Sequence, residues 1–256
     1  MTDRSAIAER LQRIPTTLAA DLLRDRDMFE RTATGFRPMT PGMTAFAGPV
    51  RTLAFLPGRP ELRARPAPPL HFTEIDTLEP GDVIVLAAGG SLHGALFGDM
   101  LATRAKARGA AGAIVDGAAR DLAGMDEVGL PVLARGTAPM AAHGTLIPVS
   151  GRCPVRLGDV TVLPDDWVLA DEDGVLVLPR ALVDLVVARH EAGAVKERFS
   201  RQLLLAGFAL AEVFPLPPAL DPCIERFAAT DAMPDPAVVR QALGAPTPHL
   251  AEGQDK

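Results

Sequence analysis

The chain has 256 residues, of which 48% are hydrophobic and 23% are charged, which is enough apolar surface for one large or two small globular domains. This composition excludes a wholly disordered chain, because such chains lack the apolar surface that offsets the entropy of ordering. Asp and Glu (32) outnumber Lys and Arg (26), and no basic run occurs, so we do not expect a nucleic acid as partner.

The hydropathy and charge pattern of the sequence predicts neither a secretory leader nor a membrane segment. No stretch approaches the ~18 consecutive apolar residues that a membrane span needs. Residues 1–14 alternate charged side chains with Ala, Ile and Leu, which predicts an amphipathic helix and not a secretory leader. The two cysteines, Cys153 and Cys223, fit a reducing compartment, although the spacing alone leaves a disulfide between them open. We therefore predict a cytoplasmic protein that does not enter the membrane.

The first half of the chain predicts an α/β fold with a central βαβ unit. The apolar run 82–88 is typical of a strand buried on both faces, and Gly89-Gly90-Ser91 are expected to end it. A helix is expected from about Ala95 to Arg108, followed by a second buried strand at 111–115. The flanking segments are predicted to be helices at 3–13 and 16–24, a strand at 47–55 and a proline-rich loop at 57–69.

The second half predicts further strands and flanking helices. Short strands are expected at 131–135 and 146–150, and residues 166–178 read as a hairpin that turns at Asp173-Gly174. A long helix is expected from Arg180 to about Glu212. We predict one domain over residues 1–214 and a proline-rich C-terminal extension over 215–256, with one short helix near 238–243.

Two motifs near these elements are too incomplete to define a site. GGSLHG (89–94) follows a strand but matches neither the dinucleotide-binding nor the P-loop pattern, and His93 within it is the one histidine expected near a ligand. Residues 171–174 (DEDG) resemble the start of a calcium loop, but the later ligands are missing. A hairpin turn is the expected role of that segment.

Two acidic residues and one arginine follow the two buried strands. Asp99 lies near the start of the helix after the first strand, and Arg120-Asp121 come shortly after the second. The carboxyl ends of neighbouring parallel strands meet at one edge of a sheet, where α/β proteins bind ligands. Carboxylate oxygens suit Mg²⁺ or Mn²⁺, and arginine binds an anionic group through two N–H donors. The cluster fits a divalent cation that holds an anionic substrate, although an Arg-Asp pair taken alone is more often a surface ion pair.

At these residues the chain resembles the RraA-like family, which includes class II pyruvate aldolases acting on 4-hydroxy-4-methyl-2-oxoglutarate and 4-carboxy-4-hydroxy-2-oxoadipate. Those aldolases carry an Asp, twenty intervening residues and then Arg-Asp, which is the spacing of Asp99 and Arg120-Asp121. The similarity covers about residues 14–214. It includes the segments TTLAADLL, FRPMTPGMTAFAGPVRT, GDMLATRAKARGAAGAIVDGAARD, LPVLARG and DDWVLADEDGVLVLP.

The resemblance implies a swivelling β/β/α-type layered fold, assembled as a homotrimer or homohexamer with sites between subunits. It implies that Asp121 binds the divalent metal directly and that Asp99 holds a water of that metal. Arg120 would contact the substrate and stabilise the developing enolate oxygen.

The resemblance also implies a subsite for the pyruvoyl carboxylate at the start of the helix. Backbone N–H groups of Met100 and Leu101, next to Gly98, would bind that carboxylate at the positive end of the helix dipole. In the aldolases an acidic residue from a neighbouring subunit assists proton transfer, and Glu197 is the positional candidate for that catalytic role here.

The implied reaction is the retro-aldol cleavage of a 4-hydroxy-2-oxo acid, a small molecule, with release of pyruvate. Mg²⁺ or Mn²⁺ would act as Lewis acid, and Arg120 would stabilise the enolate charge. Loss of CO₂ from oxaloacetate gives the same enolate, so a decarboxylase side activity is expected. The residues themselves argue against a Schiff base, which needs a desolvated lysine, since Lys106, Lys196 and Lys256 stand in polar stretches or at the terminus.

Three alternatives are weighed against this interpretation. Non-catalytic regulators of ribonuclease activity share the fold and have a GGGSL loop that GGSLHG resembles, but they typically lack the Asp after the Arg, so Asp121 favours the enzyme. A sugar-derived or other 2-oxo acid would fit the same chemistry. The menaquinone methyltransferase activity attributed to similar chains has no glycine-rich cofactor motif to support it here.

Overall fold

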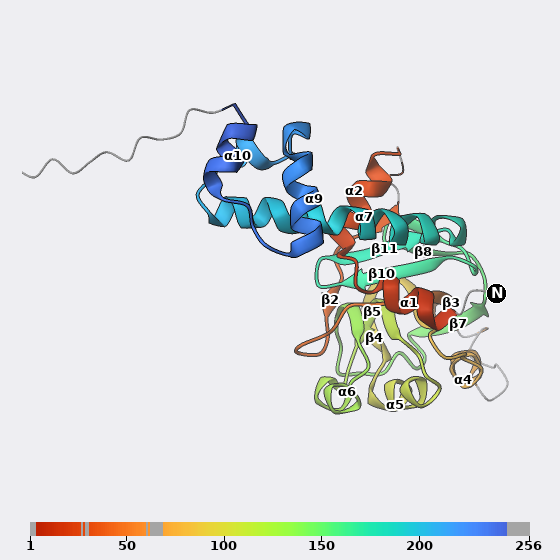
Figure 1. Cartoon of the computed structure of the whole chain (residues 1–256). Helices are drawn as coiled ribbons and strands as arrows, with labels where there is room; N and C mark the ends of the chain where they lie inside the picture. Colours follow the sequence, from red (N-terminus) through yellow and green to blue (C-terminus); the bar gives the residue numbers. More distant parts are fainter. Residues whose placement is uncertain (1–3, 27, 29–30, 60, 62–68, 245–256) are drawn as a thin grey trace, which may run out of the picture. The chain divides into compact units, whose positions relative to one another are not determined.

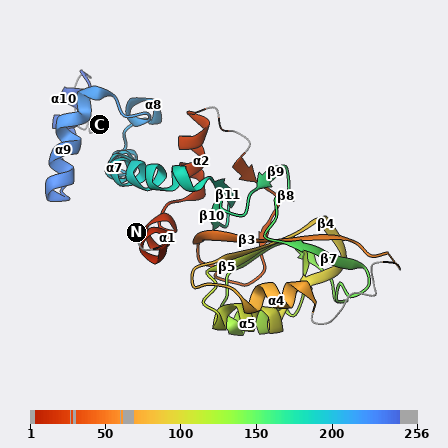
Figure 2. The ribbon, with the colours of Figure 1, turned by 90° about the vertical axis from the view of Figure 1, so that its right-hand side faces the viewer.

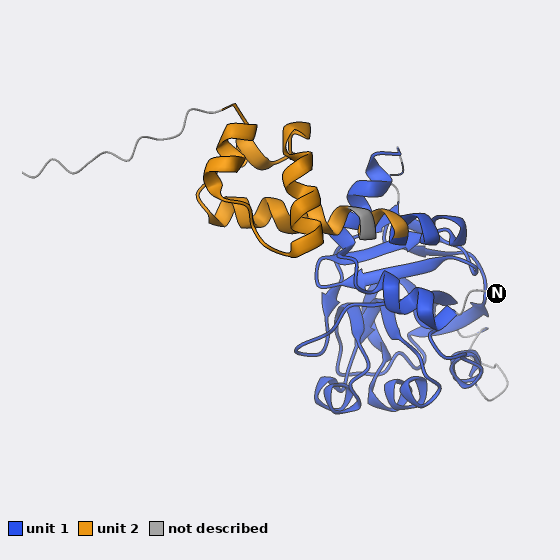
Figure 3. Ribbon diagram, viewed as in Figure 1, with its two compact units in different colours: residues 1–187 blue, residues 188–256 orange. Residues whose placement is uncertain are grey.

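The computed structural model describes residues 4–26, 28, 31–59, 61 and 69–244, with only the backbone of 191–192. The chain forms two compact units, residues 1–187 and residues 188–256, which are coloured separately in Figure 3. Helix α7 (Arg180–Leu205) begins in the first unit and ends in the second. The domain boundary predicted after residue 214 marks where the sequence similarity to the family ends. The division at residue 187 marks where one compact unit ends, so it does not test that prediction.

The first unit is built on a nine-stranded mixed sheet with the order β1-β11-β10-β3-β4-β5-β6-β2, and β7 pairs with β3 outside this path. Neighbouring strands from β3 to β6 are parallel, and the other pairings are antiparallel. Residues 34–36 alone join the end strands β1 and β2, so the sheet curls back toward itself. The strands are β1 (Thr32–Ala33), β2 (Arg37–Pro38), β3 (Phe46–Pro57), β4 (Val83–Phe97), β5 (Gly112–Ala119), β6 (Val132–Thr137), β7 (Leu146–Gly151), β10 (Trp167–Asp171) and β11 (Gly174–Leu178), with β8 (Val155–Leu157) and β9 (Val160–Val162) in a separate sheet.

Two groups of helices cover the outer faces of this curled sheet (Figure 1). Helices α4, α5 and α6 pack against β3 to β6, whereas α1, α2 and the first turns of α7 pack against β10 and β11. Figure 2 shows α4 and α5 on the side of the sheet that faces away from β10 and β11. The bounds are α1 (Arg4–Leu11), α2 (Thr16–Arg24), α4 (Leu70–Asp76), α5 (Asp99–Ala107) and α6 (Leu122–Val128).

Alternate side chains of the central strands enter different cores. In β4, Ile84 and Leu86 pack against the side of α4 to α6, while Val83 and Val85 enter the interior of the curled sheet. Successive side chains of a strand point to opposite faces, so a strand covered on both faces has a continuous apolar sequence. The structure confirms the predicted α/β class, the central βαβ unit and the buried character of its two strands.

The βαβ unit differs from the prediction in its boundaries. The helix expected from about Ala95 begins only at Asp99, because β4 continues to Phe97. Gly89 and Gly90, with φ values of 62° and 78°, do not end the strand. They lie where the pairing of β4 with β5 shifts register, which is the behaviour of a bulge. Strand β5 also extends past its predicted end at residue 115 to Ala119, so Arg120 follows the strand directly.

The second unit is helical in its described residues and has its own core. Helix α7 ends at Leu205 and not near Glu212, because Gly207 takes the left-handed conformation that terminates helices (φ 89°). The single short helix predicted near 238–243 is α10 (Pro236–Ala242), but α9 (Asp221–Thr230) was not expected. With α8 (Leu210–Val213) and a 3₁₀ turn they bury Phe199, Leu203, Phe208, Val213, Leu220, Cys223, Ile224, Phe227 and Val239.

The hairpin predicted at 166–178 is formed by β10 and β11. The carboxylate of Asp171, at the end of β10, accepts hydrogen bonds from Thr16 N (2.8 Å) and Thr16 Oγ1 (2.6 Å) at the start of α2. The acidic turn therefore caps a helix that is distant in sequence, as an aspartate does at a helix N-terminus.

Two further sequence expectations can be compared with the structure. Cys153 and Cys223 are both free thiols, so the disulfide that the spacing left open is not formed. In the described part of the chain, no helix is long and apolar enough to span a membrane.

His71 of α4 is a partly buried base among aromatic rings. Its ring centroid lies 5.9 Å from that of Phe55 and 4.6 Å from that of Phe72. Its Nδ1 is buried and has no hydrogen-bond partner among the described residues. Burial of the imidazole lowers the pKa of His71 from 6.5 to about 4, because the charged form loses its hydration.

The unfolding free energy is expected to rise with pH between about 4 and 6.5, because only the unfolded chain binds a proton at His71 in that window. The rise should be about 1–2 kcal/mol after allowance for the partial exposure of the ring. Urea unfolding of the wild type and of His71→Phe at several pH values measures it. His71→Phe should remove this part of the slope, whereas His143→Phe, at an exposed histidine, should keep it. Equal slopes in the wild type and His71→Phe would contradict the assignment.

Candidate active site

Asp121 occupies the junction between β5 and α6. Its backbone is left-handed (φ 57°, ψ 44°), a conformation that costs most non-glycine residues about 1–2 kcal/mol and that aspartate adopts more readily. It is the N-cap residue of α6, but its side chain makes no capping hydrogen bond to that helix. Aspartate in this position normally accepts such a bond. The carboxylate points instead to Arg120, with Oδ2 at 3.2 Å from Nε.

Arg120 joins the ends of the two parallel strands. Its backbone N–H donates a hydrogen bond to the carbonyl oxygen of Phe97 at the end of β4 (3.0 Å). The side chains of Arg120 and Asp121 are 41% and 42% exposed. An ion pair that is this exposed contributes about 0–1 kcal/mol, so a ligand can recruit either group without a large loss of stability.

Asp99 is the first residue of α5, directly beside this junction. Its Oδ1 accepts a hydrogen bond from the N–H of Met100 (2.6 Å). Two glycines show how closely the starts of α5 and α6 approach each other. A Cβ built on Gly98 would lie 2.8 Å from Asp121 Oδ2, and one built on Gly124 would lie 2.9 Å from Asp99 Cβ. The starts of α5 and α6 are therefore in direct contact, and the two carboxylates belong to one junction.

The structure thus brings together the three residues that the spacing singled out, at the carboxyl ends of β4 and β5. Gly98 is the buried N-cap of α5. Leu101 is the third residue of that helix, where an N–H has no partner within the helix. The Met100 N–H already donates to Asp99, so a substrate carboxylate would have to compete for it. The roles assigned to these residues stay predictions.

The other predicted participants lie elsewhere. Glu197 belongs to the second unit, where it pairs with Arg201 of the same helix at 3.1 Å and is 46% exposed. Its predicted role concerns a neighbouring subunit and stays a prediction. Lys106 and Lys196 are exposed, as their polar surroundings indicated. His93 is exposed on the bulged part of β4.

Sequence reasoning missed two parts of the site. Helix α6 was not predicted, although it positions Asp121. Gly124, in the first turn of α6, was not singled out. A glycine inside a helix is the one signal that could have indicated a close contact there.

The donor set fits a hard divalent cation that keeps part of its water shell. Within the described ranges no three or more His, Cys, Asp and Glu side chains form a group that could hold a metal. Mg²⁺ is usually held by one or two carboxylates together with water and substrate oxygens. Asp121 and Asp99 supply that number, and the exposure of Asp121 leaves room for water and substrate.

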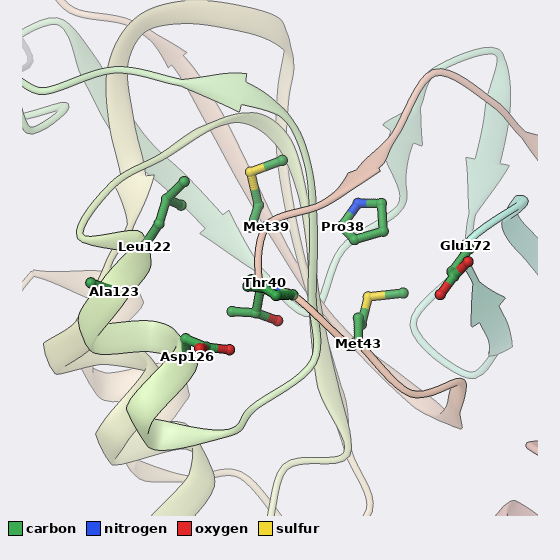
Figure 4. Close-up of a pocket in the computed structure, with 10 residues that line it drawn as sticks. Pro38, Met39, Thr40, Met43, Leu122, Ala123, Asp126 and Glu172 are labelled. Carbon is green, nitrogen blue, oxygen red and sulfur yellow. The ribbon is translucent and has the colours of Figure 1, made fainter.

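A hollow of about 510 Å³ opens beside the start of α6 (Figure 4). Leu122 and Ala123, which directly follow Asp121, form one side of it together with Asp126, and Glu172 lies on the opposite side. The loop 38–43 passes between them. Asp99, Arg120 and Asp121 do not line this hollow, so it adjoins the three-residue junction without including it.

Known proteins similar to this chain point to one family. The family model described as "RraA-like: Aldolase/RraA" matches residues 16–177. A protein of Halalkalibacterium halodurans named "Putative 4-hydroxy-4-methyl-2-oxoglutarate aldolase" is 37% identical over 110 residues, which are 43% of this chain and 52% of that protein. "Protein DlpA" of Legionella pneumophila is 27% identical over 178 residues, 69% of this chain and 28% of that protein. The chain therefore aligns with about half or less of the length of these relatives.

A solved structure extends the similarity to the fold. RraAS2 of Streptomyces coelicolor, described as an unusual member of the RNase ES inhibitor RraA protein family, superposes with a TM-score of 0.70 at 30% identity, over 78% of this chain and 98% of that one. The agreement of this fold with the match of the family model over most of the first unit identifies the chain: it belongs to the RraA-like (aldolase/RraA) family.

Proposed function

We propose that the protein is a divalent-metal-dependent lyase that cleaves a 4-hydroxy-2-oxo acid and releases pyruvate. The observation that carries the proposal is the Asp121 carboxylate. It sits at a left-handed N-cap without capping its helix, and among the described residues its ion-pair partner is Arg120, in an exposed pair. A strained backbone that presents an uncommitted acid at the ends of parallel strands is typical of a functional site.

Each residue of the junction has a role that its position supports. Asp121 would hold Mg²⁺ or Mn²⁺ directly, and Asp99 would hold it through a water. The cation, when bound, would supply Lewis-acid polarisation of the 2-oxo acid. A nearby water would take the proton of the C4 hydroxyl, the C4–O bond would become a carbonyl, and the C3–C4 bond would break with its electron pair moving into an enolate on the three-carbon fragment. Arg120 would donate N–H groups to the enolate oxygen, and the fragment takes up a proton at C3 to become pyruvate.

The proposal includes a homotrimeric or homohexameric assembly of swivelling β/β/α subunits with the site between them. Large apolar side chains are exposed on the three elements that begin or end at the junction. They are Leu92 of β4 (49%), Met100 of α5 (76%) and Leu122 of α6 (38%). Exposed large apolar side chains favour burial by a partner, here a second copy.

Coupled detection of pyruvate from a panel of 4-hydroxy-2-oxo diacids and from oxaloacetate tests the function. Mg²⁺ or Mn²⁺ should support release and a chelator should abolish it. Asp121→Asn preserves the shape of the side chain and tolerates the left-handed backbone. It should nevertheless raise the dissociation constant for Mn²⁺ at least about tenfold and reduce pyruvate release accordingly. Asp159→Asn, at an aspartate whose side chain is 96% exposed, makes the same charge change and should alter neither. Release that ignores both the chelator and Asp121→Asn would refute the metal mechanism.

The similarity to RraAS2 supports a second candidate, a non-catalytic regulator of ribonuclease activity. Such a protein would release no pyruvate from any substrate of the panel and would inhibit a ribonuclease in a cleavage assay. Retention of that inhibition in Asp121→Asn, together with the absence of Mn²⁺ binding, would reverse the order of the two candidates.

A further inference from the structure

Gly124 is a glycine in a helix at the point where α6 meets the start of α5. It is the third residue of α6 (Leu122–Val128), and its φ lies outside the left-handed region. Glycine in such a position destabilises a helix relative to alanine, because it loses more backbone freedom on folding. The local conformation therefore does not require glycine, and the reason must lie in a contact.

The contact is with Asp99. A Cβ built on Gly124 would lie 2.9 Å from Asp99 Cβ and 3.1 Å from Asp99 Oδ2. The Oδ2 atom could rotate away, but a Cβ is fixed by its own backbone. Two carbon atoms at van der Waals contact lie about 3.5–4.0 Å apart, so a side chain at 124 would force the two helix starts apart by roughly 0.6–1 Å.

That separation would act on both carboxylates. Asp121 precedes α6 by one residue, and Asp99 opens α5 with Oδ1 held by the Met100 N–H. On the other side of the junction, Gly98 leaves a similar small space against Asp121 Oδ2, 2.8 Å from a built Cβ. A glycine therefore faces each carboxylate, Gly98 beside Asp121 and Gly124 beside Asp99.

We infer that Gly124 is a positioning residue, whose missing side chain sets the separation of Asp99 from Asp121 and so the affinity of this pair for a divalent cation. The inference rests on the proposed lyase function for its catalytic consequence. Its structural part, the control of Asp99 by residue 124, concerns the metal-free protein and stands independently. A displacement of about 1 Å in a catalytic geometry can cost about a hundredfold in rate.

The test compares Gly124→Ala with Gly193→Ala. Gly193 also lies inside a helix, α7, but a Cβ there meets nothing within 4 Å. Both substitutions favour helix formation, and Gly193→Ala should raise the melting temperature by about 1–4 °C. We expect Gly124→Ala to remain folded, to shift the amide resonance of Met100 in the metal-free protein and to weaken Mn²⁺ binding at least about tenfold. Gly193→Ala should change neither the resonance nor the Mn²⁺ affinity.

The outcomes separate this inference from the proposed function. A wild type that binds no Mn²⁺ and releases no pyruvate would refute the lyase, while the Met100 resonance would still decide whether residue 124 controls Asp99. A Gly124→Ala variant with an unchanged Met100 resonance would overturn the inference whatever the wild type does. With an active wild type, an unchanged Mn²⁺ affinity in that variant would overturn it as well. If Gly124→Ala does not fold, the double variant Gly124→Ala with Asp99→Gly removes the facing Cβ: recovery of folding supports the contact, and continued failure to fold overturns it.

Discussion

Replacement of Arg120 by alanine is expected to lower kcat/KM for pyruvate release by about 100- to 1,000-fold, while the affinity for Mn²⁺ changes little. The backbone N–H of Arg120 is bonded to Phe97 at the junction, and the guanidinium Nε lies 3.2 Å from Asp121 Oδ2. Removal of one donor to a developing oxyanion commonly costs about 2.7–4 kcal/mol of transition-state stabilisation. Steady-state kinetics under saturating Mg²⁺ would measure the loss.

Two further variants show whether the loss of kcat/KM depends on the planar guanidinium group at position 120. Arg120→Lys keeps the charge but loses the planar set of donors, so it should fall between alanine and the wild type. Arg104→Ala removes an arginine from the same region, where it forms an exposed pair with Asp76 on the surface of α5, and it should keep wild-type kinetics. A kcat/KM of Arg120→Ala within about threefold of the wild type would exclude the assigned role.

Replacement of Asp116 by alanine is expected to lower the unfolding free energy of the first unit by about 1.5–3 kcal/mol, because Arg135, whose side chain is 21% exposed, loses a charged hydrogen-bond partner. Asp116 of β5 is 2% exposed, and its Oδ1 lies 2.7 Å from Nε of Arg135 on β6. Arg135 also donates to the carbonyl oxygen of Thr34 (2.6 Å) and covers the ring of Phe36 at 3.9 Å. The pair therefore fastens the segment that joins β1 to β2, where the sheet curls back on itself.

Urea unfolding followed by the fluorescence of Trp167 measures this loss, because the single tryptophan is buried in β10 of the first unit. Asp76→Ala removes an aspartate from an ion pair with side chains 51% and 55% exposed, and it should cost less than about 1 kcal/mol. A double variant, Asp116→Leu with Arg135→Met, should recover much of the stability, since apolar residues of similar size often replace a buried pair without loss. A loss of less than about 1 kcal/mol for Asp116→Ala would disprove the role of the pair in closing the sheet.

The boundaries of β4 and α7 show where sequence reasoning was limited. A pair of glycines after an apolar run predicts the end of a strand, but Gly89 and Gly90 form a bulge and β4 continues to Phe97. The continuation depends on pairing with β5, which no local pattern encodes. In α7 a regular apolar spacing was extended past Gly207, although that glycine ends the helix.

The sequence by itself determined the buried parallel strands, because an unbroken apolar run is the signature of a strand covered on both faces. It also determined that Asp99, Arg120 and Asp121 follow neighbouring strands, since parallel strands place their carboxyl ends at one edge. Only the tertiary structure decided that the Asp121 carboxylate leaves its helix uncapped, that Asp99 occupies the space a side chain at Gly124 would need and that Asp116 pairs with Arg135. These features arise from packing between elements, and periodicity along one element carries no information about which side chains of another element it will meet.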